Sequence, residues 1–161
     1  MALENILEIT DSAELERVQE QISKKKAVWL FESGRLDELT PGSFEALSEI
    51  HRVLFGEIYD FAGSIRTVNI AHPFREGNGR SMRIWLDLMF KKEIQQVVDW
   101  SKVDKDDYLM AMERSPIKDI EIKYVLRNAL TNLIDDRDMY MKGIDHSYYY
   151  EGYNIYKVEE L

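Results

Sequence analysis

The chain has 161 residues, about the length of one domain, with a formal net charge of −9 and no cysteine. The acidic balance argues against a nucleic-acid-binding protein, whose surface is basic, and the lack of cysteine excludes disulfides, thiolate nucleophiles and cysteine metal sites. No apolar run approaches the roughly 18 residues of a membrane span, and the N-terminus lacks the features of a secretory signal. We therefore expect a cytoplasmic protein with neither a membrane nor a nucleic-acid partner.

The first helix is expected over residues 12–29. Asp11 precedes it and can accept a hydrogen bond from the backbone of its first turn. The lysine run 24–26 lies in its later half and is expected on a solvated face.

A second helix is expected to open at residues 40–41, because proline is tolerated in a first turn, and to end at Gly63. His51 lies on its apolar stripe and is predicted to be a hydrogen-bonded core histidine rather than a ligand. Residues 65–70 alternate and are rich in β-branched side chains, which predicts a short strand.

The second half of the chain is also expected to be helical. A long apolar-striped helix is predicted over residues 80–100, and Ser101 could cap the next helix, which stops before Pro116. A further helix is predicted over residues 117–133, and Gly143 is expected to end the element after it.

The stretch HPFREGNGR at residues 72–80 carries the chemistry. Gly77 and Gly79 flank Asn78 directly before the long helix, which permits unusual backbone angles and a close approach of N–H groups to a ligand. Because the N-terminus of a helix attracts anions, this loop predicts a phosphate-binding turn.

Charged side chains extend the same prediction. Arg80 and Arg83 lie on one helix face and can both reach a phosphate chain. Glu76 is a hard oxygen ligand of the kind that Mg²⁺ takes beside phosphates, and His72 has the side chain best suited to remove a proton near neutral pH. The alternative from the residues alone is a turn with a buried histidine and two surface arginines.

The nine residues 72–80 match the defining motif of the Fic family position by position, and Arg83 supplies its second arginine. Residues 55–66 also resemble the segment upstream of that motif. The resemblance implies an all-α Fic-type (Fido-fold) bundle with at most a short β segment before the active-site loop. It further implies one domain over residues 1–161, in the small class with a C-terminal inhibitory helix and tail at 145–161.

The usual activity of the Fic family is transfer of AMP from ATP to a protein hydroxyl. By this resemblance His72 would deprotonate a Tyr, Thr or Ser hydroxyl of a target protein, and Glu76 would hold Mg²⁺. Arg83 would bind the γ-phosphate, and Phe74 would anchor the loop in the core. The remaining phosphate contacts implied are Gly77, Asn78, Gly79 and Arg80.

Residues 147–152, SYYYEG, resemble the inhibitory pattern Ser/Thr-x-x-x-Glu-Gly/Asn of Fic proteins. Glu151 could pair with Arg83 in place of the γ-phosphate, and Ser147 lies four residues earlier on the same face. Gly152 completes the pattern. The neighbouring side chains are candidates for self-modification: Tyr148, Tyr149 and Tyr150. The alternative is an amphipathic tail helix whose tyrosines pack in the core.

Eight residues separate Gly63 from His72, where Fic proteins usually carry a target-docking β-hairpin and further helices. A shortened chain would favour a homo-oligomer that covers exposed apolar surface. Two alternatives to AMP transfer stay open: a Fic enzyme with another phosphate-containing donor, and a non-enzymatic nucleotide-binding or interaction module. The resemblance also names a DNA topoisomerase subunit as a candidate target.

Overall fold

The computed structural model describes residues 1–66, 73–150, 152, 156–157 and 161. Within them the chain forms α-helices and one small sheet, which confirms the all-α fold class. The elements are α1 (Ser12–Glu32), η1 (Arg35–Glu38), α2 (Phe44–Phe55), α3 (Asn78–Ile94), β1 (Val97–Val98), η2 (Trp100–Lys102), α4 (Lys105–Arg114), α5 (Ile120–Asn128), β2 (Leu130–Thr131) and α6 (Arg137–Tyr150).

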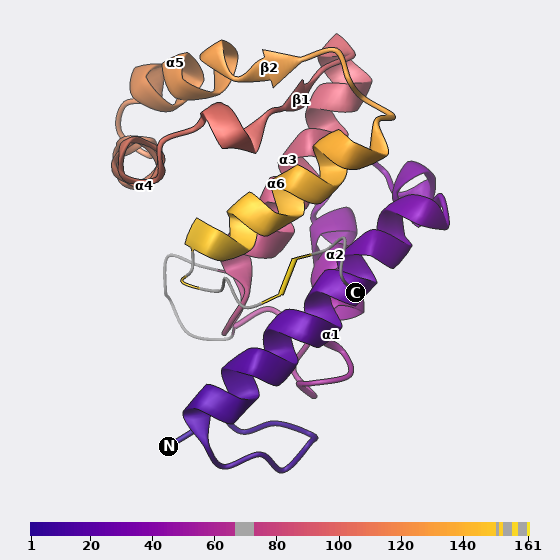
Figure 1. Ribbon diagram of the computed structural model, residues 1–161. Helices are drawn as coiled ribbons and strands as arrows, with labels where there is room; N and C mark the ends of the chain where they lie inside the picture. The colour runs from indigo at the N-terminus through magenta and orange to yellow at the C-terminus, as the bar shows by residue number, and fades with distance from the viewer. Residues whose placement is uncertain (67–72, 151, 153–155, 158–160) are drawn as a thin grey trace.

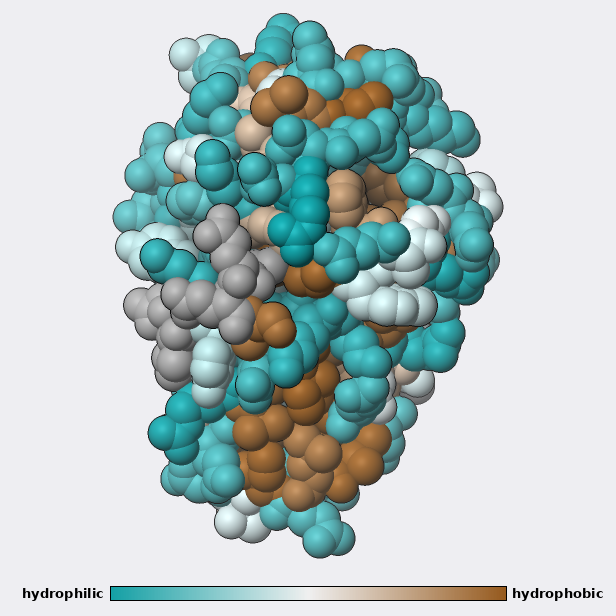
Figure 2. Space-filling model, turned by 45° about the vertical axis from the view of Figure 1, so that its right-hand side comes forward, coloured by the Kyte–Doolittle hydropathy of each residue, from teal (hydrophilic) through white to brown (hydrophobic). Residues whose placement is uncertain are grey.

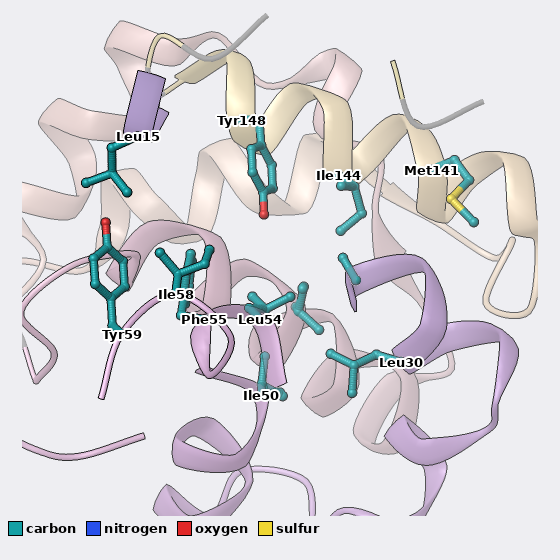
Figure 3. Close-up of a cluster of buried hydrophobic side chains, with 12 residues drawn as sticks. Leu15, Leu30, Ile50, Leu54, Phe55, Ile58, Tyr59, Met141, Ile144 and Tyr148 are labelled. Atoms are coloured by element: carbon teal, nitrogen blue, oxygen red, sulfur yellow. The ribbon is translucent and has the colours of Figure 1, made fainter. Parts of the chain in front are cut away.

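The helices enclose two hydrophobic cores. In Figure 1, α1, α2, α3 and α6 lie together, while α4, α5 and the sheet form the opposite end of the molecule. Figure 3 shows the first core, with Tyr148 pointing into it from α6. This core contains Leu15, Ala27, Leu30, Ile50, Leu54, Phe55, Ile58, Tyr59, Ile84, Met141, Ile144 and Tyr148. The second core contains Val98, Trp100, Val103, Tyr108, Ala111, Ile122, Leu126, Ala129 and Tyr150. Helix α6 therefore joins both cores.

Local capping sets the ends of the first two helices. Asp11 caps α1 as expected and accepts a hydrogen bond from the first turn. The expected start of α2 at residues 40–41 is wrong: Ser43 caps this helix, which begins at Phe44. It ends at Phe55 rather than at residue 63, and the chain continues in turns.

The long helix after the loop is shorter than predicted. It ends at Ile94, because Gln95 takes a left-handed conformation with φ 54°. Ser101 does not cap α4, since Asp104 accepts from two N–H groups of its first turn, at 3.0 Å each. The Ser101 hydroxyl bonds Asp99 instead, at 2.5 Å, within η2.

The predicted helix over 117–133 is confined to α5, because the following residues pair in a sheet. Leu130 pairs with Val98 in an antiparallel register. Gly143 does not end an element but lies inside α6. A Cβ there would lie 3.1 Å from Cδ1 of Trp100, so glycine allows the helix to approach the indole closely.

The predicted strand over 65–70 falls largely outside the described residues. Ile65 and Arg66, which are described, do not form a strand. The sheet forms elsewhere, from the two short segments β1 and β2.

The prediction that the lysines at 24–26 lie on a solvated face is wrong for Lys24. Its side chain is buried, with 1% of the residue exposed, whereas Lys25 is exposed. Lys24 bonds Glu20 at 3.1 Å on its own helix and Asp145 at 2.9 Å on α6. A buried cation is tolerated because these carboxylates pair with it.

The surface in Figure 2 is mostly hydrophilic, with apolar areas between polar side chains. One apolar area lies at the lower end of the molecule, where Figure 1 places the N-terminal segment. Ile6 and Leu7 of that segment are exposed. Across the described residues, no helix combines the length and apolarity needed to cross a membrane.

Candidate functional site

Phe74 fixes the loop between the first core and α3. Its side chain is fully buried and its ring stacks on His51, with centroids 3.9 Å apart. The Asn78 side chain accepts from the Phe74 N–H and donates to the Phe74 carbonyl, both at 2.8 Å. The amide of Asn78 thereby closes the turn, and the loop has a defined shape.

His51 is a hydrogen-bonded core histidine, as predicted. Its Nδ1 accepts from the Gly63 N–H at 2.9 Å, so its Nε2 carries the proton and donates to the Glu76 carbonyl at 2.7 Å. Burial lowers the pKa of His51 to about 4. A neutral imidazole therefore connects the Gly63 turn to the loop.

Gly77 is required at the start of α3. It has φ 70°, in the left-handed region, and occupies the N-cap position. An added Cβ would overlap the Phe55 ring. Gly79 lies in the first turn of α3.

Arg80 is buried at the base of the loop, with 1% of the residue exposed. Its Nη2 donates to Glu76 Oε1 at 2.5 Å. Its guanidinium carbon lies 4.8 Å from the Phe55 ring centre and 5.2 Å from that of Tyr148. The guanidinium is thus held by a carboxylate and by two rings, from α2 and α6.

Arg83 is buried one turn further along α3, with 4% of the residue exposed. Its Nη1 donates to Ser147 Oγ at 2.8 Å and to the Ser147 carbonyl at 3.3 Å. Among the described residues, three rings lie within 6 Å of its guanidinium carbon: Trp100 at 5.9 Å, Tyr108 at 5.7 Å and Tyr150 at 5.0 Å. Stacked aromatic faces stabilise a buried guanidinium.

The three tyrosines of α6 have different environments. Tyr148 is buried and its hydroxyl donates to Ser23 Oγ at 2.5 Å. Tyr150 is buried, burial raises its pKa to about 12, and its hydroxyl donates to the carbonyls of Trp100 and Val103. Tyr149 is 56% exposed. Only Tyr149, of the three, presents its side chain to solvent.

Two of the sequence-predicted residues, His72 and Glu151, lie outside the described residues. Gly152 is described: it is exposed, has φ 88° and donates its N–H to the Tyr149 carbonyl at 3.0 Å. Around the loop, the Arg66 N–H donates to the Pro73 carbonyl at 2.9 Å.

Glu76 fits a magnesium ion that is held mainly by phosphates and water. Its side chain is 34% exposed, and one carboxylate oxygen, Oε1, bonds Arg80. The described residues contain no cluster of three or more His, Cys, Asp or Glu side chains that could hold a metal. Because Mg²⁺ is commonly bound by one or two carboxylates plus substrate phosphates, a single glutamate suits that mode of binding.

The sequence analysis named Tyr148 only for self-modification or core packing and did not single out the other residues described here around Arg80. Gln19, on α1, is buried beside Arg80, and Phe55 and Tyr148 cover the same guanidinium. Helical spacing places Gln19 on the same side of α1 as Leu15, one turn away, which was the available signal.

Comparison with known proteins finds a distant likeness in sequence. No protein-family model matches the chain. Protein adenylyltransferase VbhT of Bartonella schoenbuchensis is 24% identical over 216 residues, covering 94% of this chain and 44% of the relative. The chain thus spans less than half the length of that relative, and the matched region is longer than the chain's 161 residues. This likeness supports, at the family level, the resemblance to the Fic family.

Proposed function

We propose that the chain is a protein adenylyltransferase that transfers AMP from ATP to a Tyr, Thr or Ser hydroxyl of a target protein. The observation that carries the proposal is the pair of buried arginines, Arg80 and Arg83, at the start of α3 beside Glu76. Two buried guanidiniums at a helix N-terminus suit a chain of phosphates. The likeness to a protein named adenylyltransferase supports AMP as the transferred group.

In the proposed reaction the hydroxyl oxygen forms a bond to the α-phosphorus. The bond between that phosphorus and the bridging oxygen breaks, and pyrophosphate leaves. His72 accepts the proton of the hydroxyl, while Arg80 stabilises the negative charge on the phosphates and Arg83 binds the γ-phosphate. Gly77, Asn78 and Gly79 shape the turn on which the phosphates rest. Glu76 would hold Mg²⁺, which would supply positive charge beside the phosphates.

The C-terminal helix restrains this activity in our proposal. The contact of Ser147 with Arg83 at 2.8 Å supports it, because it occupies one guanidinium nitrogen that would otherwise bind a phosphate. Glu151, four residues further along, would compete with the γ-phosphate for the same cation. Replacing Glu151 by glycine is therefore expected to raise the rate of AMP transfer.

Self-modification, if it follows activation, is proposed at Tyr149 in the first instance. Its side chain is 56% exposed, whereas the hydroxyls of Tyr148 and Tyr150 are bonded inside the cores. A modified Tyr148 or Tyr150 would require that part of α6 to leave its core.

The test is intact mass of Glu151→Gly before and after incubation with ATP and Mg²⁺, with and without a cell extract as the source of targets. We expect the variant to gain AMP itself or to add it to an extract protein, and the added His72→Ala substitution to abolish both. Transfer that persists without His72 would contradict the proposed base. Equal transfer by wild type and Glu151→Gly would contradict the inhibitory role.

A second candidate is a nucleotide-binding or interaction module without turnover. Two observations favour it: only eight residues separate Gly63 from His72, and the relative's matched region exceeds the length of this chain. ATP binding by Glu151→Gly without any AMP transfer, in the presence or absence of extract, would support this candidate over the enzyme.

A further inference from the structure

A buried glutamine from α1 reaches the arginine at the base of the loop. Gln19 is 3% exposed, and its amide lies between the Tyr59 hydroxyl and the Arg80 guanidinium. It comes from a helix 57 residues before Glu76 in sequence. No feature of the 72–80 motif accounts for it.

The orientation of this amide follows from its neighbours. A guanidinium can only donate hydrogen bonds, so the amide oxygen of Gln19 must face Arg80 and the amide nitrogen must face Tyr59. In this orientation the oxygen accepts from Nη1 and Nη2 of Arg80, each at 2.8 Å, and the nitrogen donates to the Tyr59 hydroxyl at 2.7 Å.

Two acceptors and two rings thereby define the position of the guanidinium. The rings of Phe55 and Tyr148 lie close to its carbon, but ring contacts alone do not fix the directions of its N–H groups. The Gln19 oxygen accepts from both terminal nitrogens and so fixes their directions, and the bond from Nη2 to Glu76 then orients the carboxylate as well.

The neutrality of the amide matters as much as its geometry. A carboxylate in the same place would make a further ion pair with Arg80, beside the one with Glu76, and would reduce the positive potential that attracts phosphates. An amide accepts the same two hydrogen bonds and adds no negative charge beside an arginine that Glu76 already pairs with.

We propose that Gln19 is a positioning residue of the phosphate site, which orients Arg80 and, through it, Glu76 without adding negative charge beside the arginine. This inference rests on the proposed function for the identity of the ligand as Mg²⁺-ATP. It assigns a role to α1, outside the loop and outside the C-terminal helix.

The test compares three substitutions in the Glu151→Gly background: Gln19→Glu, Gln19→Leu and Tyr59→Phe. The Kd for Mg²⁺-ATP is measured by calorimetry at low and at physiological salt, and AMP transfer by intact mass. Urea unfolding of each variant shows that it folds. Tyr59→Phe is the matched control, because it removes the partner of the amide nitrogen and keeps the bonds from Arg80 to the oxygen.

The order of the effects separates the proposed role from a merely structural one. Glutamate has the shape of glutamine and can accept from Arg80, so a structural role predicts a milder loss for Gln19→Glu than for Gln19→Leu. Positioning without added negative charge predicts the reverse. We expect Gln19→Glu to weaken ATP binding by more than about tenfold, more steeply at low salt, Gln19→Leu by about tenfold, and Tyr59→Phe by less than about threefold.

Equal ATP affinity of Gln19→Glu and its parent would overturn the inference, and so would equal losses for Gln19→Leu and Tyr59→Phe. These outcomes are distinct from failure of the proposed function. If no variant transfers AMP but ATP binding follows the expected order, the enzyme proposal falls and the role of Gln19 stands. If AMP is transferred but the order is reversed, the role of Gln19 falls alone. A parent that binds no ATP would overturn both.

Discussion

The backbone of Tyr156 fastens the C-terminal segment to α1. Its N–H donates to Glu20 Oε1 at 3.1 Å, and its carbonyl accepts from Lys24 Nζ. Glu20 and Lys24 are 0% and 1% exposed, and Lys24 also bonds Asp145 of α6 at 2.9 Å. Because both contacts to Tyr156 use its main-chain atoms, they depend on its peptide groups and not on its phenol ring.

The Tyr156→Pro substitution removes the N–H donor and keeps the carbonyl. A hydrogen bond to a charged group contributes about 1.5–3 kcal/mol. Glu20 retains Lys24 as a partner at 3.1 Å, so its charge stays compensated and the loss should lie near the lower value, about 1.5 kcal/mol. With a urea dependence of about 2 kcal/mol per molar, the unfolding midpoint should fall by roughly 0.7 M.

The matched control is Tyr156→Ala, which keeps both main-chain groups and should change the unfolding free energy by less than about 0.5 kcal/mol. Urea unfolding of both variants, followed by circular dichroism, measures the difference. The reasoning would be refuted if alanine cost as much as proline, because the ring would then be the anchor. It would equally be refuted if proline cost nothing.

Three further predictions concern groups inside the helical cores. Gly77→Ala should destabilise the protein by about 2–4 kcal/mol, since alanine at φ 70° is strained and its Cβ overlaps Phe55. Gly34→Ala, at φ 73° with nothing within 4 Å of the added Cβ, should cost only about 1 kcal/mol, and equal urea midpoints for the two variants would contradict the overlap. His51, whose pKa burial lowers to about 4, binds fewer protons folded than unfolded, so the unfolding free energy should fall by up to about 3 kcal/mol as the pH drops from 6.5 to 4; an imidazole that titrates near 6.5 by NMR would exclude this. Asp87 accepts from Trp100 Nε1 at 3.0 Å and burial raises its pKa to about 7, so its contribution to stability should decrease as the pH rises from 4 to 7. A stability difference between wild type and Asp87→Asn that stays constant from pH 5 to pH 8 would count against it.

The sequence was most informative where one residue type is needed for one local task. Asp11 caps α1, Phe74 fills the core, and His51 is a buried, hydrogen-bonded histidine. Asp11 bonds within its own helical turn, and His51 lies on an apolar stripe that periodicity reveals, whereas the burial of Phe74 was expected from the resemblance to the Fic family. Such local requirements can be inferred without knowledge of the tertiary structure.

The sequence was least informative where a polar group is satisfied across the fold. In the sequence Lys24 resembles a surface lysine, but it pairs with Asp145, 121 residues away. Likewise, nothing in the sequence around Gln19 indicates that its amide lies beside Arg80. The β1 and β2 segments, two residues each, are likewise too short for an alternating pattern to mark them. All of these features depend on pairing between residues far apart in the sequence, which cannot be read from residue spacing along the chain.

The net charge of the chain and the charge of the candidate site act on different length scales. A formal charge of −9 repels polyanions at long range, yet ionic screening limits that field to about 8 Å at physiological salt. Arg80 and Arg83 are buried: rings surround both, Glu76 pairs with Arg80, and the neutral Ser147 side chain bonds Arg83, so their charges act in a poorly hydrated space. An acidic protein can therefore hold two arginines together in one buried site. The same burial explains why one residue of α6 can alter the charge that Arg83 offers to a phosphate. Ser147 bonds Arg83 directly. A carboxylate after Ser147 would act on a cation with little water nearby to weaken the interaction.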